Sequence, residues 1–556
     1  MCIRDRVADC ALHLFLSKNN THINANTNLL LGFLVNELSI GEYDCLISDL
    51  IDDTDSAISF CKKNPLLFNM EYIYEADEDV LGLIYISCKN IGNRKATGSY
   101  YTSTKVVKNL ISRLSFQEPV KVLDPCCGTG NFLLQLPDVL PFDSIYGNDI
   151  DAASVKITRL NMALKYNVPV AAIYEHITGQ DYLTDYAEKD FQYIIGNPPW
   201  GYDFSEEEKS QLRTIYKSAT GKNIESYDVF IEQALNHLTD NGHLAYVLPE
   251  AILNVKAHTN IRKTILENCS IKNLVFLGNA FDGVQCPCII LDLQCTRSPL
   301  STVGMNVNTG TASFTINIER TVSAECFSFT TSDAEYNVLC KIRSMPNSAY
   351  LLDNADFALG IVTGNNKEYI SDIKNENNEM ILKGADICKY HITRTNNYIV
   401  FKPENFQQAA PTEMYRSPEK LLYRFISSQL VFAYDDKQTL SLNSCNIVIP
   451  RLPGIKIKYV LAILNSRIAQ FIYKKEFNSV KVLRSHIENI PIPTADASTQ
   501  AEIIALTDKL ISGLQSDKAE KVYDELDLLV SKAFNLDSNE IEIINKAVEG
   551  DNKFLA

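Results

Sequence analysis

Apolar runs alternate with helical stretches between residues 97 and 295, and this alternation decides the fold class of the central region. Short runs rich in Val, Ile, Leu and Phe predict strands, while the stretches between them, such as 151–165 and 227–238, have helical periodicity. Strands that alternate with helices favour a mostly parallel sheet with helices on both faces, a Rossmann-like α/β domain. The predicted strands are Val120–Leu123, Ile145–Tyr146, Phe191–Ile195, Leu244–Val247, Leu274–Phe276 and Cys288–Leu293.

The pattern changes on both sides of this region, which predicts further units. Residues before 96 predict short helices, and residues 350–495 mix short strands with one clear helix, Lys458–Tyr473. The first six residues resemble adapter-derived sequence, so we expect the N-terminal segment to be truncated. The expected units are a helical segment at 1–95, an α/β domain at 96–297, a connector at 298–349, an α+β domain at 350–495 and C-terminal helices at 496–556.

Composition narrows the class of protein. The chain has 556 residues, of which 46% are hydrophobic and 22% charged, values typical of globular proteins in water. No apolar run reaches about 18 residues, so no membrane-spanning helix and no membrane partner are expected. The 15 cysteines are scattered, which favours reduced thiols in a cytoplasmic protein over disulfides or a metal site.

The net charge of −16 argues at first against a nucleic-acid partner, but the charge is unevenly distributed. Residues 381–490 contain 16 Lys and Arg against 8 Asp and Glu, a local charge of +8, which leaves −24 for the rest of the chain. A basic segment in an acidic protein is typical of a local DNA-binding surface, although most charged faces are simply solvated.

The strongest local motif follows the first predicted strand and reads Asp124-Pro-Cys126-Cys-Gly128-Thr-Gly130. Glycines at a strand-to-helix turn let a ligand approach the backbone at the carboxyl end of the strand. A carboxylate at Asp124 repels phosphate and suits a cationic ligand. S-adenosylmethionine fits, because its methionine part carries an ammonium and a sulfonium; a generic nucleotide site is the alternative that this motif alone leaves open.

Further acidic residues end the next strands of the series. Asp149, about 20 residues after the loop, is placed to accept hydrogen bonds from both ribose hydroxyls, and Asp151 to cap the following helix. A further short strand, the third of the series, precedes Thr178 and the strand Phe191–Ile195; Asp181 follows it and can accept a hydrogen bond from the adenine amino group of the cofactor. Three such motifs in order favour an S-adenosylmethionine site over turns that merely end strands.

The fourth predicted strand ends in Asn197-Pro198-Pro199-Trp200. Two prolines cannot continue a hydrogen-bond ladder, so the chain must turn there. The Asn197 amide oxygen and the Pro198 carbonyl can each accept one hydrogen of an exocyclic amine, which keeps the nitrogen lone pair directed at a methyl donor. Trp200 offers a flat face on which a base can stack, and a base in a duplex must be flipped out to reach it.

These motifs, in this order, resemble the amino-methyltransferases of restriction–modification systems in which the recognition domain follows the catalytic domain, the TaqI/Eco57I-like class. The resemblance covers residues 90–295 strongly and 350–550 more loosely. It implies that Tyr101 and Thr102 contact the methionine end of the cofactor and that Phe230 packs on its adenine. It also implies that Phe281 stacks on the target base, although spacing alone favours an ordinary core position for this residue.

The resemblance implies a site-specific methyltransferase that acts on N6 of adenine, with double-stranded DNA as partner, a separate restriction endonuclease beside it and no metal. Residues 350–495 are then the target-recognition domain. The alternatives are cytosine N4 as target, an RNA base-amine methyltransferase, the methyltransferase part of a truncated bifunctional restriction enzyme, and an inactive DNA-binding subunit. The more than 200 residues after Leu293 favour DNA over RNA or protein as substrate.

Overall fold

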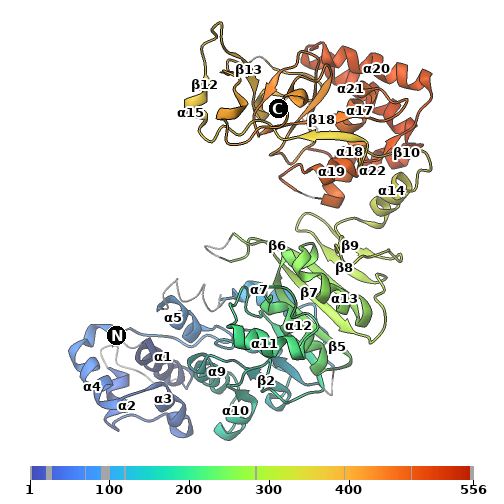
Figure 1. The fold of residues 1–556 in the computed structure, drawn as a ribbon. Coiled ribbons are helices and arrows are strands. Elements are labelled where there is room, and N and C mark those ends of the chain that lie inside the picture. The colour runs from blue at the N-terminus through green and yellow to red at the C-terminus, as the bar shows by residue number, and fades with distance from the viewer. Residues whose placement is uncertain are drawn as a thin grey trace. The chain divides into compact units, whose positions relative to one another are not determined.

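The computed structural model describes residues 3–19, 28–68, 70–88, 101–117, 120–281, 285–393, 395–477 and 479–550 (Figure 1). The chain divides into two compact units, Met1–Phe329 and Thr330–Ala556. The division falls inside the segment that the sequence predicts as a connector. Each unit has its own hydrophobic cores, so the two are described separately.

A sheet of nine strands, counted over the described residues, organises the first unit. The strands are β1 (Val122–Asp124), β2 (Ile145–Asn148), β3 (Ile177–Thr178), β4 (Phe191–Gly196), β5 (Leu238–Pro249), β6 (Cys269–Gly278), β7 (Cys288–Cys295), β8 (Met305–Asn308) and β9 (Ser313–Ile316). Their order is β3-β2-β1-β4-β5-β7-β6-β8-β9. The first five strands in this order, β3-β2-β1-β4-β5, pair in parallel, and β7 lies antiparallel between β5 and β6. The mostly parallel sheet predicted from the sequence is confirmed.

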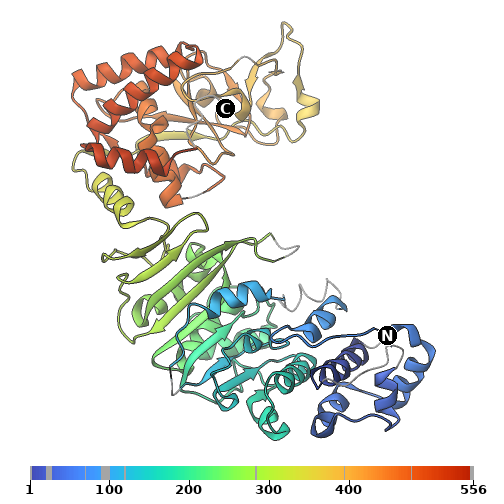
Figure 2. The ribbon, with the colours of Figure 1, turned by 180° about the vertical axis from the view of Figure 1, so that it is seen from behind.

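Helices cover both faces of this sheet, as Figure 2 shows from behind. Neighbouring residues of one strand enter different cores: Ile195 packs with the N-terminal helices and α9, whereas Ile194 packs with α12 and α13. Burial on both faces is why these strands are continuous apolar runs. The helices are α7 (Thr104–Ile111), α8 (Asn131–Leu134), α9 (Ala152–Lys165), α10 (Val170–His176), α11 (Glu206–Ile215), α12 (Ser226–His237) and α13 (Thr259–Asn268).

The N-terminal helices belong to the same unit and share its core. They are α1 (Ile3–Lys18), α2 (Leu29–Leu34), α3 (Asp44–Leu50), α4 (Thr54–Lys63) and α5 (Val80–Cys88). Helices α1, α3 and α5 all contact α9, the helix that follows β2. The short helices predicted for residues 1–95 are therefore packed directly on the α/β domain.

The first part of the predicted connector belongs to the sheet. β8 pairs in parallel with β6, and β9 pairs antiparallel with β8. Both strands have only four residues, and three of the four in β9 are exposed or half-buried, so their hydrophobic pattern is weak. Their place is fixed by pairing to β6, a long-range contact that the local pattern does not encode.

The second unit contains two small four-stranded sheets and a two-stranded pair, within the ranges described above, and confirms the expected mixture of strands and helices. The strand orders are β11-β18-β15-β16, β12-β14-β13-β17 and β10-β19, formed by β10 (Ser348–Ala349), β11 (Ala355–Ala358), β12 (Ile370–Ser371), β13 (Glu379–Leu382), β14 (Tyr398–Ile399), β15 (Lys420–Arg424), β16 (Phe432–Asp435), β17 (Leu440–Ser441), β18 (Cys445–Pro450) and β19 (Ile492–Pro493). The helices are α14 (Asp333–Arg343), α15 (Asn366–Tyr369), α16 (Thr412–Tyr415), α17 (Ile457–Asn465), α18 (Arg467–Ile472), α19 (Arg484–Glu488), α20 (Ala497–Ile511), α21 (Ser516–Ala533) and α22 (Ser538–Ala547).

The single helix predicted over Lys458–Tyr473 is wrong, because the chain breaks at Ser466. Ser466 has extended backbone angles and caps α18, its Oγ accepting from the N–H of Ala469 at 3.1 Å. The preceding Asn465 carboxamide pairs with both backbone groups of Phe432 in β16, each at 2.9 Å. The break thus joins α17 to the sheet.

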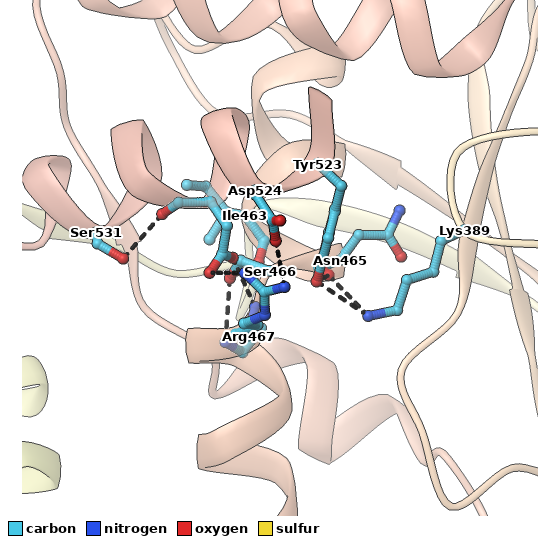
Figure 3. Close-up of polar contacts among 10 residues, drawn as sticks. Lys389, Ile463, Asn465, Ser466, Arg467, Tyr523, Asp524 and Ser531 are labelled. Carbon is cyan, nitrogen blue, oxygen red and sulfur yellow. Dashed lines mark hydrogen bonds and ion pairs between the residues drawn. The ribbon is translucent and has the colours of Figure 1, made fainter. Parts of the chain in front are cut away.

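The break leaves the backbone carbonyl of Asn465 without a helical partner, and buried side chains donate hydrogen bonds to it instead (Figure 3). The carbonyl of Asn465 accepts from Lys389 Nζ at 3.0 Å and from the Tyr523 hydroxyl at 2.9 Å. Arg467, the first residue of α18, pairs with Asp524 of α21 at 2.5 Å. Together these contacts hold α17, α18 and α21 at one point. The two hydrogen bonds to the Asn465 carbonyl replace the one that a continuous helix would have supplied.

Much of the positive charge in residues 381–490 is neutralised inside the second unit. Lys420 is buried and pairs with Asp435. Five other cations pair with carboxylates outside this window: Arg416 with Glu379, Arg451 with Asp356, Lys458 with Asp508, Arg467 with Asp524 and Lys475 with Glu335. The charge of +8 counted from the sequence therefore overstates the basic surface that could face DNA.

The described residues bear on three expectations from composition, about disulfides, membrane helices and metal sites. Every cysteine in the described ranges is a free thiol. Within those ranges no helix is long and apolar enough to cross a membrane. The described His, Cys, Asp and Glu side chains form no cluster of three or more that could hold a metal ion.

Candidate active site

A cavity of about 630 Å³ lies where the chain leaves β1, β2, β3 and β4. Its volume is in the range of small-molecule sites. The described residues that line it include Tyr101, Thr102, Cys126, Gly128, Asp149, Asp181, Asn197, Pro199 and Phe230, all predicted from the sequence. Its lining does not include Asp124, Gly130, Pro198, Trp200 or Phe281, among the residues described. The structure thus brings most of the predicted site residues together.

The loop after β1 has the backbone shape that its glycines predict. Gly128 and Gly130 have φ angles of +54° and +93°, in the left-handed region that side chains disfavour. The Cys127 N–H donates to the Asn148 carbonyl at 2.9 Å, and the Gly130 N–H donates to the Cys127 carbonyl at 2.8 Å. These bonds hold the loop against the end of β2.

Asp149 is fixed by backbone donors on both sides. Its Oδ2 accepts from the N–H of Gly128 at 2.8 Å, and its Oδ1 accepts from the N–H of Asp151 at 2.8 Å. Asp151 caps α9, accepting from the Ala153 N–H, so the predicted cap is confirmed. The glycine loop and the end of β2 therefore present the Asp149 carboxylate to the cavity in one orientation.

Asp124 lies behind the cavity wall and is fully buried. Its Oδ1 accepts from the Cys126 N–H at 3.2 Å, and its Oδ2 has no hydrogen-bond partner among the described residues. Burial raises the pKa of this carboxyl well above its usual value, and the nearby negative charge of Asp149 adds to the shift. A Cβ on Gly196 would lie 2.6 Å from Asp124 Oδ1, so β1 and β4 end in close contact.

Asn197 begins the loop after β4, and its carboxamide is held in one orientation. Its Nδ2 donates to Thr102 Oγ1 at 3.0 Å, while the Thr102 carbonyl accepts from Asn131 Nδ2 at 2.7 Å. The Asn197 Oδ1 is buried and lacks a hydrogen-bond partner in the part of the chain that the structure describes. An acceptor held this way at a cavity is available to an amine of a ligand.

The start of α12 anchors the rest of this loop. Ser226 Oγ donates to the Pro199 carbonyl at 2.5 Å and accepts from the Tyr202 N–H at 3.4 Å. Ser226 is fully buried, so solvent does not compete for these bonds. The two prolines and this anchor together fix the path of the chain between Asn197 and Trp200.

Trp200 and Phe281, the predicted stacking residues, meet each other outside the cavity lining. Their rings pack edge to face, with centroids 4.9 Å apart and an angle of 82° between the planes. Phe281 is 7% exposed and belongs to the core that holds the N-terminal helices. The two rings are therefore in direct contact, and no base-sized slot separates them.

Asp181 and Phe230 line another part of the cavity. Asp181 Oδ1 accepts from the N–H of Leu183 at 2.9 Å, which orients its carboxylate. Phe230, in α12, is 9% exposed and its ring lies 5.5 Å from that of Tyr182. A carboxylate beside aromatic rings suits the amino group and the flat face of a purine.

Sequence reasoning missed the residues that hold the cavity-lining loops in place. Asn131 directly follows Gly130, so its place could have been read from the glycine motif. Ser226 reaches Pro199 across 27 residues, and Asp79 reaches the glycine loop at Thr129 across 50 residues. No local pattern marks contacts of that separation.

Two segments of the chain match known families. Residues 76–313 match the N-6 DNA Methylase family, and residues 379–492 match the TaqI-like C-terminal specificity domain. The two matches identify the first segment as an N-6 DNA Methylase domain and the second as a TaqI-like specificity domain. The first match contains every cavity residue, and the second lies in the second unit. The methyltransferase fold and the DNA-specificity domain expected from the sequence are confirmed.

Individual relatives of this methyltransferase come from restriction–modification systems. It is 28% identical to the type II methyltransferase M.VspI of Vibrio sp. (strain 343) over 330 residues, which are 58% of this chain and 79% of that one. It is 25% identical to the putative type II restriction enzyme and methyltransferase RM.MjaORFECS2P of Methanocaldococcus jannaschii over 51% of this chain, but over 25% of that protein. The solved structure of the type IIL restriction–modification enzyme MmeI in complex with DNA has a similar fold, with a TM-score of 0.57, 12% identity and coverage of 100% and 99% of the two chains.

Proposed function

We propose that this methyltransferase transfers a methyl group from S-adenosylmethionine to N6 of adenine in double-stranded DNA. The observation that carries the proposal is the Asn197 carboxamide, whose nitrogen is fixed by Thr102 and whose buried oxygen is left as an acceptor at the cavity. The family match supports DNA as the substrate. The order of the motifs, with the recognition domain last, favours adenine over cytosine.

The residues around the cavity fit S-adenosylmethionine, which supplies an electrophilic methyl group on a positively charged sulfur. Asp149 and Asp181 both line the cavity. The Asp149 carboxylate suits the ribose hydroxyls, and the Asp181 carboxylate suits the adenine amine. Phe230 offers an apolar face to the adenine ring. Tyr101 and Thr102 line the same cavity and are assigned to the methionine end. We therefore assign the cavity to this cofactor.

Asn197 orients the amine that accepts the methyl group. Its Oδ1 accepts one amine hydrogen, and the Pro198 carbonyl accepts the other. Both bonds would pull the hydrogens out of the plane of the base, so the nitrogen becomes pyramidal and its lone pair is localised and directed at the methyl donor. The site would then need no strong base before transfer: the methyl group would pass from sulfur to nitrogen, S-adenosylhomocysteine would be the other product, and the extra proton on nitrogen would be lost to solvent.

The target adenine reaches this site only after it leaves the duplex. Flipping costs a few kcal/mol, which stacking and hydrogen bonds in the site offset. Trp200 is the stacking surface that we assign to the flipped base, a contact worth about 1–3 kcal/mol. Phe281, which packs edge-on against Trp200, supports that ring from the side.

DNA sequence recognition is assigned to the second unit, where the specificity-domain match lies. Because several of its cations are paired internally, phosphate contacts have to supply less of the DNA affinity than the net charge suggests, and sequence is read by base contacts from its loops. A separate restriction endonuclease is the partner that we propose beside it.

Three of the alternatives left open by the sequence are cytosine N4 as the target, a larger bifunctional enzyme and an inactive DNA-binding subunit. Cytosine N4 carries the same kind of amine, and the Asn197 geometry suits it equally. The match to the putative restriction enzyme and methyltransferase of M. jannaschii spans a quarter of that protein, which is compatible with this chain being the methyltransferase part of a larger bifunctional enzyme. The intact cavity and the available Asn197 acceptor count against an inactive DNA-binding subunit.

The test is incubation of the purified protein with methyl-labelled S-adenosylmethionine and, separately, duplex DNA, total RNA and protein extract. We expect N6-methyladenine in the DNA, and none with Asn197→Ala. Label on cytosine N4, in RNA or in protein would overturn the substrate. No label with the cofactor bound would favour an inactive subunit or a missing segment.

A further inference from the structure

A buried carboxylate outside the cavity connects the N-terminal helices to the glycine loop. Asp79 directly precedes α5 and is fully buried; its Oδ1 accepts from the Gly82 N–H at 2.8 Å, as a helix cap does. Its Oδ2 accepts from Thr129 Oγ1 at 2.5 Å. Thr129 stands between Gly128 and Gly130, so this one side chain joins the start of α5 to the loop that lines the cavity.

A side chain from α9 completes the contact. Asn161 Nδ2 donates to Asp79 Oδ1 at 2.8 Å and to the Thr129 carbonyl at 2.7 Å. The hydroxyl and the carbonyl of Thr129 are thus both held, by two different elements. Because all three side chains are buried, loss of any partner leaves a polar group that water does not readily satisfy.

Helix α5 lies close to the Thr129 side chain of this loop. A Cβ on Gly82 would lie 2.0 Å from Asp79 Oδ2 and 2.2 Å from Thr129 Oγ1, so only glycine fits. Farther along the helix, Tyr85 donates to Asp151 Oδ2 at 3.0 Å, and Ile86 lines the cavity. One face of α5 therefore follows the cavity wall from the glycine loop to the end of β2.

We propose that Asp79 is a positioning residue for the S-adenosylmethionine site, which holds Thr129 so that the glycine loop keeps its binding conformation. The inference rests on the proposed function and adds that the N-terminal helices are part of the cofactor site. Asp79 is absent from the cavity lining among the described residues, so it acts through the loop. The bond that depends on it most directly is the one from the Gly128 N–H to Asp149.

The test measures the dissociation constant of S-adenosylmethionine by titration calorimetry at about pH 8. Burial raises the pKa of the Asp79 carboxyl to about 6, so the carboxylate predominates at that pH. We expect Asp79→Ala and Thr129→Val each to weaken binding about tenfold or more. The double variant should bind no more weakly than the worse single variant, because both changes remove the same hydrogen bond.

Asp79→Asn is the conservative variant and should bind nearly as the wild type does. Its amide oxygen can accept from Gly82 and Asn161, and its nitrogen can donate to the Thr129 hydroxyl. In turnover assays Asp79→Ala should raise the KM for the cofactor and leave kcat at saturation close to the wild-type value. A general loss of structure would lower both binding and kcat.

Two control variants separate positioning from stability. Asp77→Asn changes a carboxylate two residues away that pairs with Lys165 and makes no hydrogen bond to the glycine loop among the described residues, and its φ of +66° suits Asn. Leu12→Ala removes a fully buried side chain from α1 and destabilises the same helices. We expect both controls to bind the cofactor as the wild type does, while Leu12→Ala lowers the melting temperature measured without ligand.

The outcomes distinguish this inference from the proposed function. If the wild type binds no S-adenosylmethionine, the proposed function fails and this inference fails with it. If the wild type binds and Asp79→Ala binds equally well, this inference alone is overturned. Equal weakening by Leu12→Ala and Asp79→Ala overturns it too, because the effect would then come from general destabilisation.

Discussion

Replacing Thr102 with Val tests whether the Thr102 hydroxyl orients Asn197. Val has nearly the shape of Thr but offers no acceptor to Asn197 Nδ2, which lies 3.0 Å from Thr102 Oγ1. The Thr102 carbonyl still accepts from Asn131, so the backbone should stay in place. The substitution therefore changes one hydrogen bond at the candidate catalytic loop and little else.

The size of the effect follows from burial. Thr102 is 6% exposed, so water does not freely replace the lost acceptor. An unsatisfied buried amide donor costs about 1–3 kcal/mol, or else the Asn197 carboxamide rotates and its oxygen loses the direction needed for the amine. If this cost falls on the transition state alone, kcat drops roughly 5- to 150-fold.

The assay is single-turnover methylation of duplex DNA at saturating cofactor, with the dissociation constant of S-adenosylmethionine measured in parallel. We expect Thr102→Val to lower the rate and Thr102→Ser to restore it, since Ser keeps the hydroxyl. An unchanged rate with weaker cofactor binding would refute the orienting role and leave the contact with the methionine end that the family resemblance implies. No change in either quantity would refute both roles.

Further substitutions test the remaining assignments. Asn197→Ala should abolish turnover, because the amine loses its acceptor, while calorimetry shows near-normal cofactor binding; loss of binding would contradict the role. Asp149→Ala should weaken cofactor binding, and an unchanged affinity in the same titration would remove Asp149 from the ribose. Gly196→Ala places a Cβ 2.6 Å from Asp124 Oδ1 at a φ of +143°, so thermal denaturation should show a loss of about 1–3 kcal/mol or more; a wild-type melting temperature would mean that the ends of β1 and β4 separate easily.

The sequence was informative wherever local pattern decides structure. Strands buried on both faces are continuous apolar runs, and so β1 and β4 were placed to within two residues. Parallel strands end at the same edge of a sheet, which is why Asp149, Asp181 and Asn197 could be expected together from their positions after strands. Ligand-facing residues of this fold follow strand ends, and strand ends can be read locally.

Features set by distant partners were not readable in this way. Apolar periodicity over residues 458–473 continues through the break at Ser466, because both α17 and α18 are buried. What breaks the helix is the pairing of the Asn465 carboxamide with β16, 33 residues earlier in the chain. The free charge of residues 381–490 was overestimated for a similar reason, since carboxylates that pair with these cations lie outside that window, at Glu335, Asp356 and Asp508 among others.

Asp79 shows why the supporting residues of a site are harder to infer than its lining. An Asp before an apolar helix predicts a cap, and one of its oxygens does cap α5. The other oxygen has a partner only because α5 packs on α9 and brings Thr129 within reach, a consequence of the shared core. A boundary drawn at residue 95 from the change of pattern separates these groups, whereas the family match begins at residue 76 and includes both. The glycine motif therefore identifies the loop, but the helices before it decide whether that loop keeps the shape the cofactor needs.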